Sequence, residues 1–175
     1  MFWMKITVPE IKKHLLLLED TPRRIATLTT GLEEIRLSWA PDGTTWSAVE
    51  ILAHLRACAE LWSFSIYAML SADSPVLPDL DERRWAKVAR YASQEFHRSF
   101  EIFAIQRAEL LGMLKELPFD PWARSGTIAG QSHTVYSQAR RIALHEVEHC
   151  IQFEELLLPI HPGNQGTVFR GHDRS

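Results

Sequence analysis

The sequence has little of what several common classes of protein require. Only two of its 175 residues are cysteine, Cys58 and Cys150, and they form no C-x-x-C pair. Neither a disulfide framework nor a thiolate zinc knuckle is therefore expected. This cysteine usage fits a reducing compartment, and the expected location is cytoplasmic.

Long runs of one kind of residue are also missing. The longest apolar run near the N-terminus, Leu15 to Leu18, is too short for a signal peptide or a membrane span. The formal net charge is -3, and there is neither a basic run nor a glycine-rich phosphate loop. We therefore expect no membrane and no nucleic acid among the partners.

Helical periodicity, in contrast, is present along most of the chain. Apolar residues recur at steps of three and four, and no segment has a convincing strand pattern. Four helices are predicted, over Pro22 to Leu37, Trp46 to Leu70, Asp79 to Leu117 with a break near residues 92–93, and Thr134 to Leu157. The Thr21-Pro22 pair predicts where the first helix begins, because an N-cap residue is followed by proline in the first turn. An additional short helix within residues 1–20 is left open.

These elements predict an all-α fold, a four-helix bundle. With 175 residues, 46% of them hydrophobic, the chain can bury one substantial core but not two. Residues 1–158 are therefore expected to form a single domain, and residues 159–175 a flexible C-terminal tail. The long loop between helices 3 and 4, residues 119–133, is expected to border a site. The helix from Trp46 is apolar nearly all round, which favours a homodimer.

Three histidines lie on the apolar faces of two predicted helices. His145 and His149 are one turn apart, so their side chains lie side by side, and His54 lies on the apolar face of the helix from Trp46. A buried ring nitrogen without a partner costs about 1 to 3 kcal/mol, and a divalent cation removes that cost. We predict that these three histidines bind a metal ion; the alternative is that they are hydrogen-bonded core residues. The remaining histidines are assigned to the surface or to loops, and they are His14, His97, His133, His161 and His172.

His145 to His149 also reads H-E-x-x-H, the zinc signature of metalloproteases. The extended form of that motif requires glycine and histidine where this chain has Gln152 and Glu155. The form with a downstream glutamate ligand requires a further helix, but Pro159 ends the last one. A zinc protease is therefore the least favoured function.

Two segments resemble a known family. Trp46 to Leu55 reads W-S-x-x-E-x-x-x-H-L, and His145 to Gln152 reads H-x-x-x-H-x-x-Q. In this order, with a helix containing Arg107 between them, they resemble the DinB-like superfamily of small four-helix-bundle metalloproteins. The resemblance covers about Thr21 to Leu158. It implies a three-histidine site for zinc, nickel or a related divalent ion, carried here by the three histidines named above, and a frequently dimeric protein.

The resemblance leaves the reaction open. Some members are thiol-dependent S-transferases that act with bacillithiol or mycothiol, some have been called metal-dependent hydrolases, and many have no known reaction. Three neutral ligands leave a coordination position open, which is typical of catalytic sites. We therefore expect a metal-dependent transferase or hydrolase acting on a small molecule, with a low-molecular-weight thiol as a possible cofactor. A non-catalytic stress-response or sensing bundle is the alternative.

Other residues are candidates for a role beside the ion. Glu146 is predicted to orient a ligand or act as a base, with a solvated acid as the alternative. Gln152 is predicted to hydrogen-bond substrate, or else to satisfy a polar group in the core. Arg107 could receive a thiol cofactor's carboxylate, although a pair with a buried glutamate is favoured. Glu50 is predicted to cap its helix, and support of a metal ligand is the alternative. Cys58 is predicted to be a small core residue, and a fourth metal ligand is the alternative.

Overall fold

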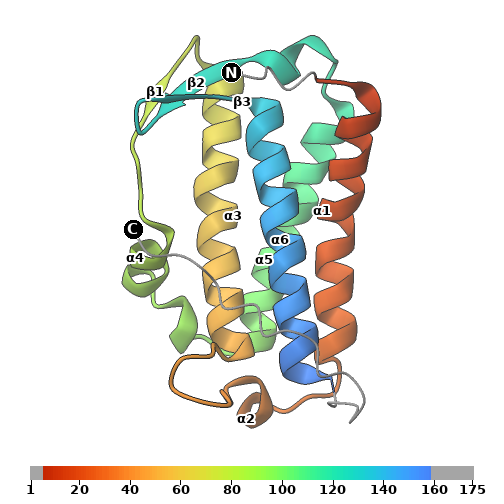
Figure 1. Cartoon of the computed structure of the whole chain (residues 1–175), viewed down its shortest axis with the longest axis vertical. Helices are drawn as coiled ribbons and strands as arrows, with labels where there is room; N and C mark the ends of the chain where they lie inside the picture. Colours follow the sequence, from red (N-terminus) through yellow and green to blue (C-terminus); the bar gives the residue numbers. More distant parts are fainter. Residues whose placement is uncertain (1–5, 159–175) are drawn as a thin grey trace.

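The computed structural model describes residues 6–158, whose main feature is a bundle of four long helices (Figure 1). These are α1 (Val8–Thr29), α3 (Ala48–Ser71), α5 (Phe96–Glu116) and α6 (Val135–Leu157). Both α1 and α3 pack against α5 and α6, so the order around the bundle is α1, α6, α3, α5. The predicted four-helix bundle is thus confirmed. The predicted tail, residues 159–175, lies outside the described residues.

The starts of α3 and α6 follow from local capping. Ser47 accepts a hydrogen bond from the backbone N–H of Glu50, whose carboxylate accepts one from the backbone N–H of Ser47. The favoured capping role of Glu50 is therefore present. Thr134 caps α6 in the same way, accepting from the backbone N–H of Ser137. Such caps satisfy backbone N–H groups that have no partner inside the helix.

The first helix begins earlier than the sequence pattern predicts. It starts at Val8 and continues through Pro22, so the predicted start at Pro22 is wrong. The buried face of α1 runs without interruption through Ile11, His14, Leu18 and Ile25. Packing of this face outweighs the hydrogen bond that a proline removes from a helix interior. His14 is 3% exposed, so its surface assignment is also wrong.

The expectation of no strand is wrong as well. Strand β1 (Val76–Leu77) pairs in parallel with β2 (Ser125–Ile128), which pairs antiparallel with β3 (Gln131–Thr134). This small sheet lies across one end of the bundle, at the top of Figure 1. Ala129 and Gly130 both have positive φ, as a two-residue hairpin turn of type I′ requires. The long loop is therefore a hairpin preceded by a short 3-10 helix, η2 (Asp120–Ala123).

Short elements complete the chain. They are α2 (Glu34–Leu37), α4 (Glu82–Val88) and the 3-10 helix η1 (Tyr91–Ser93). The predicted helix over residues 79–117 is thus divided into α4 and α5, with η1 at the predicted break near residues 92–93. Within residues 6–158, no helix has both the length and the apolar character needed to cross a membrane.

The core has two apolar halves with a polar layer between them. One half contains Leu18, Leu110 and Ile142, and the other contains Ile25, Phe103 and Phe153. Between these positions along their helices lie Thr21 on α1, Arg107 on α5 and Glu146 on α6, all buried. Arg107 donates a hydrogen bond to Glu146. A charged pair therefore joins α5 to α6 in the middle of the bundle.

Candidate metal centre

The three predicted histidines come together between α3 and α6. The Nε2 atom of His145 lies 3.2 Å from Nε2 of His54 and 3.1 Å from Nε2 of His149. Two ligand nitrogens bound to one tetrahedral zinc, each at 2.0 to 2.1 Å, are about 3.3 Å apart. The observed separations therefore match the edge of such a coordination sphere. The histidines fit a divalent ion without rearrangement of either helix.

The ring orientation of His149 is set by Gln152. In the tautomer that suits this contact, Nδ1–H of His149 donates to Oε1 of Gln152 over 2.7 Å, and the lone pair remains on Nε2. Support of this kind orients a ligand and raises its basicity. Gln152 is thus a positioning residue for His149, and its predicted contact with substrate stays a prediction.

Burial keeps the three imidazoles neutral. Burial lowers the pKa of His54 to about 4, with smaller contributions from the charges of His149 and Arg83. The pKa of His145 falls to about 3 because of burial and the neighbouring histidines and Arg141. Burial also lowers the pKa of His149, against a raising effect of the bond to Gln152. Neutral rings have free lone pairs at neutral pH, as metal ligation requires.

Two tryptophans cover the histidines. The Trp46 ring lies 5.2 Å from the His54 ring and stacks on His149 at 6.3 Å, measured between centroids. The Trp62 ring meets the His145 ring edge-on at 4.8 Å. These apolar rings limit the access of water to the ring nitrogens. Neither tryptophan was identified from the sequence as a neighbour of the histidines.

Cys58 belongs to the same cluster. Its Sγ atom lies 3.5 Å from Nε2 of His54, and one ligand atom from each of His54, Cys58 and His145 lies within 4.8 Å of the others. The side chain is 2% exposed, and burial raises the pKa of its thiol. The four-residue spacing from His54 to Cys58 was the signal in the sequence. Cys58 is buried, as the favoured assignment to the core predicts, and its sulfur also lies beside a histidine.

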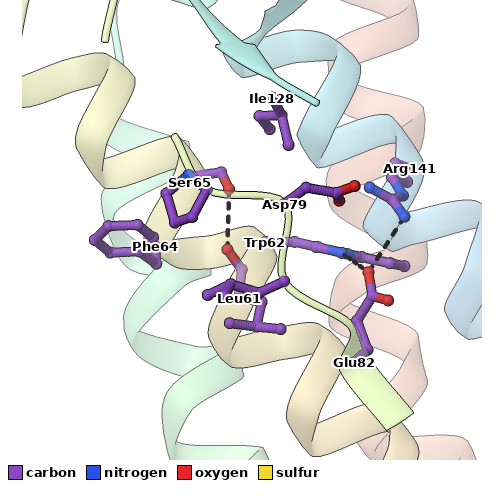
Figure 2. Close-up of a pocket in the computed structure, with 10 residues that line it drawn as sticks. Leu61, Trp62, Phe64, Ser65, Asp79, Glu82, Ile128 and Arg141 are labelled. Carbon is purple, nitrogen blue, oxygen red and sulfur yellow. Dashed lines mark hydrogen bonds and ion pairs between the residues drawn. The ribbon is translucent and has the colours of Figure 1, made fainter. Parts of the chain in front are cut away.

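A cavity of about 120 Å³ is lined in part by Trp62 (Figure 2). Its apolar wall includes Leu61 and Phe64 of α3. Glu82 accepts hydrogen bonds from the Trp62 indole N–H, over 2.7 Å, and from Arg141, over 3.3 Å. Figure 2 shows these three side chains together. Arg141 also lies over the Trp62 ring, 4.0 Å from its centroid. The indole of Trp62 therefore contacts both the cavity and the ring of His145.

Glu146 and Arg107 are bound to each other. Their side chains are 2% and 1% exposed, and Arg107 donates to Oε1 of Glu146. Burial raises the pKa of Glu146, and the positive charge of Arg107 opposes that shift. The structure therefore gives both residues a structural partner, the arrangement favoured for Arg107. The catalytic role of Glu146 and the cofactor-binding role of Arg107 stay predictions.

Comparisons with known proteins extend the fold assignment. No curated protein matches the sequence. Among solved structures, the chain is similar to YfiT from Bacillus subtilis, with a TM-score of 0.78 and 14% identity. The match covers 89% of this chain and 90% of YfiT, which is described as a probable metal-dependent hydrolase with an unusual four-helix bundle topology. At this identity the likeness establishes the fold.

A family model establishes the wider relationship. The model of the DinB superfamily matches residues 17–153, which include the three histidines and most of the bundle. This range agrees closely with the span of the resemblance seen in the sequence. The chain belongs to the DinB superfamily.

Proposed function

We propose that this protein is a divalent-metal-dependent enzyme that acts on a small molecule, by hydrolysis or by transfer of a thiol. The observation that carries the proposal is the convergence of three Nε2 atoms, from His54, His145 and His149. Three neutral donors leave the charge of the ion uncompensated and a position open to substrate. Zinc and nickel are the ions proposed, since both accept imidazole ligands.

The residues around the histidines prepare the site for such chemistry. A bound divalent ion lowers the pKa of a water or thiol that binds to it, which makes a nucleophile available at neutral pH. Gln152 holds His149 in the tautomer that binds metal, and Trp46 and Trp62 restrict the entry of water. Glu146 is bound to Arg107, and we assign it no step in the reaction.

Metal analysis of purified variants tests this proposal. About one divalent ion per chain is expected in the wild type, and severalfold less after His54→Ala or His149→Ala, since each removes one of the three imidazole ligands. His97→Ala is the matched control, because His97 is exposed and its ring contacts the backbone of Leu32. Unchanged metal content in both ligand variants would place the ion elsewhere in the protein.

The reaction requires a separate assay. We would incubate the metal-loaded wild type with pairs of thiols and electrophiles, and with a panel of small esters and amides, beside the His149→Ala variant. Turnover that depends on His149 supports an enzyme and identifies its class. The description of YfiT as a probable metal-dependent hydrolase supports including hydrolysis in the panel.

The cavity beside Trp62 is the proposed position of the substrate's organic part. It combines an apolar wall, Leu61 and Phe64, with polar groups on Glu82 and Arg141, and it shares Trp62 with the histidine cluster. Ser65 lines this cavity, is buried, and its hydroxyl bonds to the backbone of its own helix, so Ser65→Leu fills the space at a cost in packing of about 1 to 3 kcal/mol.

For the substrate that the panel identifies, Ser65→Leu is expected to lower kcat/KM about tenfold or more, because added methyl groups exclude bound atoms from a filled pocket. Metal content should remain at the wild-type value. Ser71→Leu serves as control, since Ser71 is an exposed serine on the same helix that also bonds within it. Equal kcat/KM for wild type and Ser65→Leu would place the substrate outside this cavity.

One observation favours a second function. Cys58 stands beside the histidines, and a site with four protein ligands is typical of structural metal centres. A non-catalytic stress-response or sensing bundle therefore remains the alternative, and it predicts stoichiometric metal with no turnover across the panel. A zinc protease would need the glutamate of H-E-x-x-H, Glu146, as its general base. That carboxylate is bound to Arg107, which argues against the protease alternative.

Other expectations about partners stay predictions. The described residues leave Phe64 and Tyr67 of α3 51% and 41% exposed, which supports the proposed homodimer. A thiol cosubstrate, the cytoplasmic location and the absence of nucleic acid and membrane partners rest on the sequence alone.

A further inference from the structure

Two pairs of side chains with the same spacing face each other in the histidine cluster. His145 and His149 lie four residues apart on α6, and His54 and Cys58 lie four residues apart on α3. Residues at this spacing are neighbours on one face of a helix. Since α3 and α6 pack together, each helix presents two potential ligand atoms to the space between them.

The distances in the α3 pair agree with shared coordination. Sγ of Cys58 lies 3.5 Å from Nε2 of His54. In a tetrahedral zinc site, with Zn–S near 2.3 Å and Zn–N near 2.0 to 2.1 Å, sulfur and nitrogen ligand atoms are about 3.6 Å apart. The ligand atoms of Cys58, His54 and His145 all lie within 4.8 Å of one another. These three ligand atoms are close enough to share one ion, and His149 joins them through Nε2 of His145, 3.1 Å from its own Nε2.

The second cysteine provides an internal comparison. Cys150 is also a free, fully buried cysteine, and it immediately follows the ligand candidate His149. It packs in the apolar half of the core that contains Phe153, whereas the sulfur of Cys58 contacts the His54 ring. Burial of a cysteine in this bundle therefore does not by itself place sulfur beside the histidines. The position of Cys58 on the His54 face does.

We propose that Cys58 is the fourth protein ligand of the metal, which completes a coordination sphere of three nitrogens and one sulfur. The inference rests on the proposed metal centre. When the ion binds, the S–H bond breaks, the proton leaves to solvent and a sulfur–metal bond forms, with no change in oxidation state. The thiolate compensates one positive charge and favours ions that accept sulfur, such as zinc, over hard ions such as magnesium.

This ligand set changes how a substrate reaches the ion. With four protein ligands, the substrate must either displace the Cys58 thiolate or bind as a fifth ligand, an expansion that catalytic zinc sites permit. The resting centre is therefore closed, and it opens during turnover. Removal of the Cys58 sulfur should leave the three histidines able to hold an ion with a position open to water.

Cobalt substitution tests the proposal directly. The full chain is depleted of metal, loaded with Co²⁺ and examined by absorption spectroscopy as wild type, Cys58→Ala and Cys150→Ala. We expect a sulfur-to-cobalt charge-transfer band in the near ultraviolet for wild type and Cys150→Ala, and its loss in Cys58→Ala. The visible ligand-field bands of cobalt should persist in Cys58→Ala, because three histidines remain.

X-ray absorption of the zinc-loaded wild type provides a check that needs no variant. One Zn–S distance near 2.3 Å is expected, beside Zn–N distances near 2.0 to 2.1 Å. Bound metal with no sulfur ligand in the wild type would overturn the role of Cys58 and leave the three-histidine centre intact. A charge-transfer band that persists in Cys58→Ala would also overturn it. Failure of the wild type to bind cobalt or zinc at all would overturn the proposed metal centre itself.

Discussion

Replacing Glu146 with alanine is expected to lower the free energy of unfolding by about 3 to 5 kcal/mol, the usual effect of breaking a buried ion pair. The guanidinium of Arg107 is 1% exposed and would lose its only carboxylate partner among the described residues. Its Nε and Nη1 atoms already have no hydrogen-bond partner there. A buried cation without a counter-charge is costly, and water has little access to compensate it. Urea denaturation at neutral pH measures the loss.

The matched control removes both charges at once. An Arg107→Met and Glu146→Leu double variant keeps the volume of the polar layer roughly constant and leaves no buried charge. Such replacements range from neutral to stabilising by about 1 to 4 kcal/mol. A double variant as unstable as Glu146→Ala would show that the loss does not come from the unpaired cation. If the double variant also retains metal and turnover, Glu146 has no catalytic role.

The histidine cluster was predictable because helical spacing places the histidines on single faces of two helices, and packing of those helices brings the faces together. His145 and His149 share a face of α6, and His54 lies on the buried side of α3, so only the facing of two adjacent helices was needed to join them. The sequence could not reveal the axial offset between these helices. That offset decides which atoms meet between α3 and α6, here Nε2 of His54 and Nε2 of His145. The offset between α5 and α6, equally hidden in the sequence, places Glu146 beside Arg107.

The errors in the fold have local physical causes. Thr21-Pro22 resembles a helix start, but Thr21 lies on the same buried face as Leu18 and Ile25, and packing of that face continues the helix. Strands β2 and β3 have four residues each; β3 has only polar side chains and Ile128 is the one large apolar side chain of β2, so neither shows the alternating pattern of a strand. Their pairing depends on backbone hydrogen bonds and on close approach. A Cβ atom at Gly126, for example, would lie 2.9 Å from the Pro75 carbonyl oxygen.

Acidification is expected to destabilise the metal-free protein steeply below pH 6.5. The pKa of His54 is about 4 and that of His145 about 3 in the folded protein, whereas both have the ordinary value of 6.5 when unfolded. Above pH 6.5 neither state binds these protons, so the two histidines do not affect stability. Below it the unfolded chain takes up protons that the folded protein excludes, and the free energy of unfolding falls.

Each histidine contributes a slope of about 1.4 kcal/mol per pH unit, so the pair lowers the free energy of unfolding by about 2 to 3 kcal/mol per unit between pH 6 and pH 4. The slope from His54 ends near pH 4, where the folded protein also takes up its proton, and that from His145 ends near pH 3. Urea denaturation midpoints of chelator-treated protein at pH 7, 6 and 5 measure this fall in the free energy of unfolding. A His54→Asn and His145→Asn double variant should flatten the dependence, because asparagine does not titrate. An equal pH dependence in this variant and the wild type would assign the acid sensitivity to other groups, and the burial of two neutral histidines would then contribute little to it.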